Sequence, residues 1–248
     1  MIELIRPDWP APANVRAAIT CRAGGVSLSP YASLNLGDHV GDDPLAVATN
    51  QQRLAVALSL PAEPLWLTQV HGCAVADLED ARRGCEADAA FADRPDRVCA
   101  VLTADCLPLL LCDQQGERIC AVHAGWRGLA SGVIEAALRR MGRPGSELLA
   151  WLGPAIGPER FEVGAEVREA FVAHADEAAI AFRPAEQGKW LADIYRLARQ
   201  RLAAFGVGFV GGGDYCTVSD PKRFYSYRRD GVTGRMASLI WLQQGELS

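Results

Sequence analysis

Three apolar segments follow one another closely in the middle of the chain, at residues 97–103, 107–112 and 118–123. Segments of this length and composition are typical of buried β-strands. The links between them hold only a few residues, whereas a crossover between parallel strands needs a dozen or more. This spacing excludes an all-parallel sheet and predicts a mixed, partly antiparallel one.

The rest of the chain contains both strand-like and helix-like segments. Further strands are expected at 15–21, 65–70, 148–152, 207–211, 223–227 and 236–242. Helical periodicity predicts helices at 44–59, 129–141, 164–175 and 191–205. Asp43 and Pro44 supply a cap and a first-turn proline for the first helix, and Gly142 follows the end of the second.

Strands and helices do not alternate strictly, as a Rossmann fold or a barrel would require. We therefore predict an α+β fold, layered, in which mixed β-sheets are flanked by helices. No linker or repeat interrupts the chain, so residues 1–248 are expected to form a single domain.

Charge and composition exclude several classes of partner. Hydrophobic residues make up 50% and charged residues 22% of the chain, which is typical of a folded globule. The 25 basic residues are outnumbered by 30 acidic ones, which disfavours a general nucleic-acid binder. No apolar run approaches the ~18–20 residues that span a bilayer, and the first residues show no export signal. We expect a cytoplasmic protein with no membrane partner, and a monomer by default.

Eight cysteines occur, and no two of them form a Cys-x-x-Cys pair. In a large chain without an export signal, free thiols are expected rather than disulfides. Cys99, Cys112 and Cys120 fall inside apolar segments, where a buried and unreactive thiol is the expected state.

Three metal-ligating side chains stand where predicted strands end. His71 follows Leu-Thr-Gln-Val, Cys106 follows Val-Leu-Thr-Ala-Asp, and His123 follows Ile-Cys-Ala-Val before a glycine-rich turn. Two imidazoles and one thiolate form a catalytic zinc set that leaves the fourth position open for water or substrate. The same ligands also suit copper. Spacing alone leaves open the plainer interpretation of two turn histidines and a core cysteine.

A second chemistry fits the same residues. Cys106 and His123 can form a thiolate–imidazolium pair for nucleophilic catalysis, with Asp105 or another carboxylate orienting the ring. Mutation of these residues would not separate the two mechanisms, whereas the metal content would.

Several arginines and one histidine lie in loops suited to binding an anion. Arg127 stands in Gly-Trp-Arg-Gly directly before a predicted helix, where free backbone N–H groups can hold a phosphate or carboxylate. Arg22 precedes a glycine pair, Arg228 follows Tyr-Ser-Tyr, and His39 lies in a polar, glycine-punctuated loop. His174 falls within a predicted helix and is expected at the surface. No P-loop and no Gly-x-Gly-x-x-Gly fingerprint occurs.

Taken together, these segments resemble the laccase-domain family, also called YfiH-like or polyphenol oxidase-like. The most specific are Leu-Thr-Gln-Val-His-Gly at 67–72, Leu-Thr-Ala-Asp-Cys-Leu-Pro at 102–108 and Ala-Val-His-Ala-Gly-Trp-Arg-Gly at 121–128. Further matches lie at 22–27, 33–42, 153–158 and 227–231. Two positions depart from the family pattern: Ala92 stands where a threonine is usual, and Cys21 where serine or threonine is commoner.

The resemblance implies a layered fold similar to that of certain toxin cysteine hydrolases, and a zinc ion on the residues that match His71, Cys106 and His123. It also implies purine nucleoside chemistry: phosphorolysis of adenosine, inosine and S-methyl-5′-thioadenosine, with adenosine deamination as an additional activity. Older naming describes copper-dependent polyphenol oxidation, and some members are linked to editing of peptidoglycan precursors. The four histidines of this chain are too few for a multicopper oxidase, whose coppers are held mostly by histidines, so copper-dependent polyphenol oxidation stays an alternative only as a one-copper activity. A binding module without turnover is a third alternative.

Roles for individual residues follow from this hypothesis. The expected partners are purine nucleosides and phosphate. Cys106, His123 and Asp105 are the predicted catalytic residues, and Asp105, Asp88 and His39 are candidates for protonating or orienting the base. The predicted substrate-binding residues are Arg22, Asn35, His39, Gln69, Arg127 and Arg228.

Overall fold

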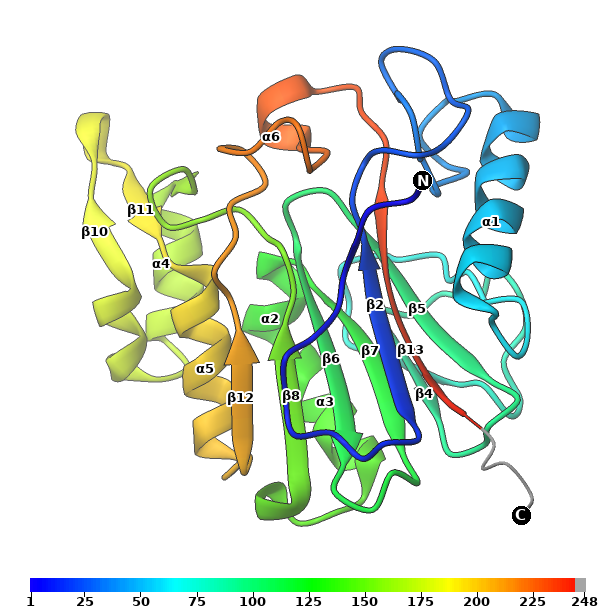
Figure 1. The fold of residues 1–248 in the computed structure, drawn as a ribbon. Coiled ribbons are helices and arrows are strands. Elements are labelled where there is room, and N and C mark those ends of the chain that lie inside the picture. Colours follow the sequence, from blue (N-terminus) through cyan, green and yellow to red (C-terminus); the bar gives the residue numbers. More distant parts are fainter. Residues whose placement is uncertain (244–248) are drawn as a thin grey trace.

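The computed structural model describes residues 1–243, which fold into two stacked β-sheets with helices on both outer sides (Figure 1). Helix α1 covers the outer face of a four-stranded sheet, and α2, α3 and α5 cover the outer face of a six-stranded sheet. A third apolar cluster fills the space between the two sheets. The predicted layering of mixed sheets and flanking helices is confirmed. No helix within the described residues is long and apolar enough to cross a membrane.

The elements have the following bounds. The α-helices are α1 Pro44–Leu58, α2 Trp126–Ser131, α3 Val133–Met141, α4 Ala165–Val172, α5 Ile194–Ala204 and α6 Tyr227–Asp230. Short 3₁₀ turns are η1 Gly145–Glu147, η2 Asp176–Ala181 and η3 Glu186–Gly188. The four-stranded sheet has the spatial order β1 Leu4–Ile5, β2 Val15–Thr20, β13 Met236–Leu242 and β5 Val98–Thr103. The six-stranded sheet has the order β12 Phe209–Gly212, β8 Leu148–Leu152, β6 Leu107–Asp113, β7 Ile119–Ala124, β4 Ala89–Ala92 and β3 Val75–Asp77. A small third sheet has the order β10 Phe182–Pro184, β11 Trp190–Ala192 and β9 Glu162–Val163.

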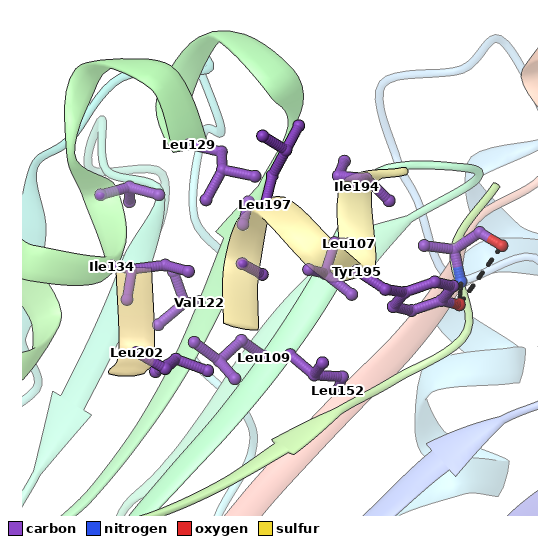
Figure 2. Packing of buried hydrophobic residues seen from close by; sticks show 14 of the residues in the cluster. Leu107, Leu109, Val122, Leu129, Ile134, Leu152, Ile194, Tyr195, Leu197 and Leu202 are labelled. Carbon is purple, nitrogen blue, oxygen red and sulfur yellow. Dashed lines mark hydrogen bonds between the residues drawn. The ribbon is translucent and has the colours of Figure 1, made fainter. Parts of the chain in front are cut away.

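The central strands are apolar throughout because both of their faces are covered. In β6, Leu107, Leu109 and Leu111 pack against the helices, whereas Leu110 and Cys112 pack between the sheets. Successive side chains of a strand point to opposite faces, so a strand buried on both sides shows no polar alternation. Figure 2 shows the helix-facing side, where each fully buried leucine contributes about 1.5–3 kcal/mol by leaving water.

Helix α5 also fixes the loops above this core. The hydroxyl of Tyr195, which is labelled in Figure 2, accepts the N–H of Ala155 at 2.7 Å and donates to the carbonyl of Tyr215 at 2.8 Å. Two loops that are distant in sequence are thereby held at the same end of the sheet.

The chain crosses from one sheet to the other between β5 and β6. Strands β6 and β7 form an antiparallel hairpin, as the short link predicts. Strand β5 instead pairs with β13 in the other sheet. Cys106 lies in this crossing, directly before β6.

Several predicted boundaries were wrong, each for a local reason. The helix expected at 129–141 is divided at Gly132, whose φ of 99° ends α2 and begins α3. The helix expected at 191–205 begins only at Ile194, because the side chain of Asp193 caps it. Segments 65–70 and 223–227 are not strands. The first makes only an isolated bridge at Thr68, and in the second Ser226 caps α6.

Candidate metal centre

The three predicted ligands lie together at one edge of the six-stranded sheet. Cys106 immediately precedes β6, His123 lies near the end of β7, and His71 follows the extended segment 65–70. Their ligand atoms all lie within 4.8 Å of one another, and Cys106 Sγ is 3.8 Å from His71 Nε2. The two imidazole rings meet edge to face, with centroids 4.8 Å apart. The structure thus brings together the residues that the sequence spacing grouped.

Unusual backbone conformations make this approach possible. His71 and Asp105 adopt positive φ angles of 59° and 92°. Such conformations cost a non-glycine residue of order 1–3 kcal/mol and cluster at functional sites. Gly125 closes the other side: an added Cβ would lie 2.8 Å from His71 Cδ2 and 3.1 Å from Cys106 Sγ. Only glycine lets the chain after β7 pass this close to the cluster.

Asp88 is the structural support of the cluster. Its carboxylate is fully buried and accepts the backbone N–H groups of His71 at 2.9 Å and Gly72 at 2.6 Å. The same carboxylate accepts a hydrogen bond from His123 Nδ1 at 2.8 Å. This bond orients the ring and leaves His123 Nε2 free to face a ligand. Because Asp88 is completely enclosed, it positions the histidines and has no surface for a substrate.

The electrostatics of the cluster favour a charged thiolate. Burial raises the pKa of Cys106, but the neighbouring His123 and His71 outweigh it and bring the pKa to about 6. Burial lowers the pKa of His123, but the charge of Cys106 and the bond to Asp88 outweigh that and raise it to about 9. Burial also raises the pKa of Asp88, yet its bonds from His123, Gly72 and His71 bring it below its usual value. In the metal-free cluster, the charged forms of Cys106 and His123 therefore stabilise each other.

These residues fit a metal ion. With bond lengths of about 2.3 Å to sulfur and 2.0 Å to nitrogen, tetrahedral zinc separates such ligands by about 3.5 Å. The 3.8 Å between Cys106 Sγ and His71 Nε2 is close to that value. A thiolate and two imidazoles are ligands for zinc and also for copper, so the donor set does not decide between the two metals.

Two cavities meet at the cluster and share His71, Ala104, Cys106 and Tyr227 in their walls. The first, of about 270 Å³, is here called the Phe161 cavity. The rest of its wall includes Asp105, Trp126, Arg127, Ile156, Phe161 and Arg228. The second, of about 390 Å³, is called the Arg235 cavity. Its wall includes His39, Gln69, Thr103, His123 and Arg235.

Four of the predicted substrate-binding residues line these cavities. Arg127 and Arg228 belong to the Phe161 cavity, and His39 and Gln69 to the Arg235 cavity. The Gln69 amide is already engaged, because it donates to the carbonyl and accepts the N–H of Leu102. Gln69 thus joins the segment before His71 to β5.

The other two predicted residues lie outside both cavity walls. Arg22 donates to the carbonyls of Ala32 and Pro221, and its guanidinium lies over the ring of Tyr225. Asn35 is fully buried and accepts the backbone N–H of Arg235 at 2.9 Å. Each of them connects loops beside the site.

Asp105 connects the cluster to the loops above it. Its carboxylate accepts the hydroxyl of Thr217 at 2.5 Å and the backbone N–H of Arg228 at 2.6 Å. Helix α6 is thereby held over the ends of the central strands (Figure 1). Its first residue, Tyr227, belongs to the walls of both cavities.

Sequence reasoning missed Thr217, Arg235, Tyr227 and Phe161 as part of this region. Only Tyr227 carried a signal, because it belongs to the Tyr-Arg-Arg-Asp-Gly segment. Arg235 directly precedes the buried strand β13, a position that does not by itself mark a functional arginine.

Fold and cluster together define a layered α/β protein whose strand ends present a His-Cys-His set suited to a metal. A family profile described as "Multi-copper polyphenol oxidoreductase laccase" matches residues 16–243. The chain belongs to this family, as the sequence resemblance indicated.

Curated relatives and a solved structure match this chain over nearly its whole length. A Pseudomonas aeruginosa protein named as a purine nucleoside phosphorylase is 58% identical, over 96% of this chain and 98% of its own. The purine nucleoside phosphorylase YfiH of Escherichia coli is 53% identical, over 98% of this chain and 100% of its own. A crystal structure of a Neisseria meningitidis protein superposes with a TM-score of 0.94 at 50% identity, covering 97% of this chain and 99% of the other.

Proposed function

We propose that the chain is a zinc-dependent purine nucleoside phosphorylase. Its proposed substrates are adenosine, inosine and S-methyl-5′-thioadenosine, each cleaved with phosphate, and adenosine deamination is a proposed further activity. Similar proteins from two organisms carry the name of such an enzyme, at 58% and 53% identity. The observation that carries the proposal is the position of the His-Cys-His cluster, where two cavities meet.

Phosphorolysis sets clear requirements for the site. A phosphate oxygen forms a bond to C1′ of the ribose while the bond from C1′ to the purine breaks. The base leaves with the electron pair and takes up a proton, and the products are the free base and ribose 1-phosphate. The site must therefore hold two reactants in line and place polar groups where charge develops.

The residues of this chain can meet those requirements. His71, Cys106 and His123 would hold the ion, and Asp88 keeps His123 in the ligating orientation. Bound there, zinc supplies a Lewis acid that polarises an oxygen of water or phosphate. Asp105 fixes the backbone of Arg228, so that the start of α6 forms part of the wall of the Phe161 cavity.

Two measurements on the protein purified without added metal test the proposal. Elemental analysis should give about one zinc per chain. Inosine with phosphate should yield hypoxanthine and ribose 1-phosphate by chromatography. Zinc-free protein with full activity, or zinc-loaded protein that releases no base, would overturn it.

A second candidate function rests on one specific observation. Cys106, His123 and Asp88 lie in the order thiol, imidazole and carboxylate: His123 Nδ1 donates to Asp88 at 2.8 Å, and the ligand atoms of His123 and Cys106 lie within 4.8 Å of each other. This arrangement is that of a cysteine hydrolase. Amides of cell-wall precursors are the substrates to examine.

Chelation separates the two candidates. Removing the metal should abolish phosphorolysis, because its loss leaves the cluster without a Lewis acid. A hydrolase would instead gain activity, since the Cys106 thiolate would become free to attack. Amide hydrolysis that rises on chelation, with no base release before it, would favour the second candidate.

A further inference from the structure

The two cavities differ in the chemistry of their walls, although they share the metal cluster. The Phe161 cavity offers broad apolar surfaces from Trp126, Ile156, Phe161 and Ile194. The Arg235 cavity offers a guanidinium and an imidazole beside the ends of β5 and β7. A planar purine base suits the apolar wall of the Phe161 cavity, and a compact anion suits the charged wall of the Arg235 cavity.

Within residues 1–243, no carboxylate pairs with the charge of Arg235. Its Nη1 donates to the carbonyls of Thr233 and Gly234, at 3.0 and 3.1 Å. Among residues 1–243, Nε and Nη2 have no hydrogen-bond partner, and no carboxylate forms an ion pair with the guanidinium. Burial lowers the pKa of Arg235, while the charges of Cys106 and Asp105 act in the opposite direction. A half-buried guanidinium with free N–H groups is a strong site for an oxyanion.

The surroundings hold this arginine in place. Its backbone N–H donates to Asn35, and its side-chain stem lies against Gly37. A Cβ added at Gly37 would lie 2.8 Å from Arg235 Cγ. The stem is thus confined, and the guanidinium is kept at the cavity wall.

His39 adds a polar group without a second charge. Burial is the first cause that lowers the pKa of His39, and the charge of Arg235 lowers it further. The imidazole is therefore neutral at physiological pH and can exchange hydrogen bonds with a phosphate hydroxyl or oxygen.

The direction of the reaction matches this arrangement. In a displacement at C1′, the incoming phosphate and the departing base occupy opposite sides of the carbon. Two cavities that share Cys106 and Tyr227 in their walls can hold the two reactants in separate places beside one cluster.

We propose that the Arg235 cavity is the phosphate subsite, with Arg235 and His39 as its oxyanion-binding residues, and that the Phe161 cavity receives the purine nucleoside. This assignment rests on the proposed phosphorylase function. It makes Arg235, rather than Arg127 or Arg228, the arginine that binds phosphate.

The test compares Arg235→Gln and Arg235→Lys with Arg127→Gln, which alters the other cavity, and with Arg94→Gln, an exposed arginine outside both. Arg235→Gln should raise the KM for phosphate about 10- to 100-fold, the cost of a lost charge-assisted bond. The KM for inosine should change less than about threefold, and lysine should restore part of the phosphate affinity. Arg94→Gln should change neither constant.

Binding of inorganic phosphate to the purified protein, measured by calorimetry, provides a readout independent of turnover. Binding should weaken in Arg235→Gln and stay unchanged in Arg94→Gln. Gly37→Ala is a second variant that displaces the Arg235 stem without removing its charge, and it should weaken phosphate binding in the same direction.

Three results would overturn the assignment: an unchanged phosphate KM and binding constant in Arg235→Gln, an equal rise in both KM values, or a phosphate-specific defect in Arg127→Gln. If the unaltered protein releases no base, the phosphorylase proposal fails. In that case calorimetry still decides whether Arg235 binds phosphate.

Discussion

Cys106 directly precedes strand β6 and Cys112 lies near the other end of that strand, and the two differ sharply in chemistry. At the site end, two histidines bring the pKa of Cys106 to about 6. Towards the far end, burial raises the pKa of Cys112 to about 12, with the charge of Asp113 adding to it. Cys112 packs in the apolar layer between the sheets, where a thiolate has no cation to stabilise it. One residue type thus serves as a ligand or as a small core side chain, according to which end of the strand it occupies.

Two buried aspartates show the same contrast. The carboxylate of Asp88 accepts hydrogen bonds from His123 and from the turn that carries His71. The carboxylate of Asp113 accepts the N–H groups of Glu117 and Arg118 in the turn between β6 and β7. Both carboxylates are fully buried, yet one supports a reactive cluster and the other a hairpin. Burial alone therefore does not distinguish a functional carboxylate, whereas the nature of its partners does.

The largest expected effect is the difference in metal content and phosphorolysis between alanine variants of the two cysteines. Cys106→Ala should remove the metal and lower phosphorolysis more than about 100-fold, beyond the 10- to 100-fold that loss of an outer partner costs. Cys112→Ala should keep both properties and lose about 1 kcal/mol of stability, because it leaves a small cavity. Metal analysis and thermal unfolding of the pair check this. Full metal content in Cys106→Ala would contradict the ligand assignment.

The next effect separates the two aspartates. Asp88→Asn removes the charge that orients His123 and should weaken metal affinity 10- to 100-fold, measured by competition with a chelator. Asp113→Asn should destabilise the fold, since Asp113 also pairs with Arg143, and should leave metal affinity unchanged. Equal metal affinities in the two variants would remove the distinction between these carboxylates.

Thiol alkylation of the metal-free protein compares the cysteines directly. With a pKa of about 6, Cys106 is mostly thiolate at pH 7, and its alkylation should fall only as the pH drops below that value. An ordinary exposed thiol is only a few per cent ionised at pH 7. Cys99, Cys112 and Cys120 should remain unlabelled because they are buried and their pKa values are raised. Peptide mass spectrometry over a pH series measures the extent of alkylation at each cysteine. An alkylation midpoint for Cys106 near the pKa of a free thiol would contradict the prediction.

The sequence predicted the layered fold and grouped the three ligands because both depend on local patterns. The apolar strands β5, β6 and β7 are visible as continuous segments, and each ligand follows or ends such a segment. The crossing from one sheet to the other at Cys106 was not predictable, because β5 and β6 are equally apolar and their pairing depends on distant β13.

The outer part of the site depends on long-range contacts that leave little trace in the sequence. Asp88 was visible as a candidate, but its bond to His123 depends on the pairing of β4 with β7. Thr217 reaches Asp105 from more than a hundred residues away, and Arg235 reaches the cavity from the start of β13. Neither residue type marks its role, since threonine in a loop and arginine before a strand are both ordinary.

The smallest expected effect concerns that long-range contact. Thr217→Val keeps the shape of the side chain and removes the hydroxyl that Asp105 accepts, leaving one buried carboxylate oxygen without this partner. It should cost about 1–3 kcal/mol of unfolding free energy and lower kcat/KM a few-fold, because the backbone of Arg228 is held by the same carboxylate. Thr217→Ser retains the hydroxyl and is the matched control, which should preserve activity. Metal content should stay full in both, since Asp105 acts on the loops above the cluster and not on its ligands. A loss of metal in Thr217→Val would instead show that metal binding by the His-Cys-His cluster depends on the contacts of Asp105 with Thr217 and α6. Those contacts would then matter for metal affinity as much as Asp88 does.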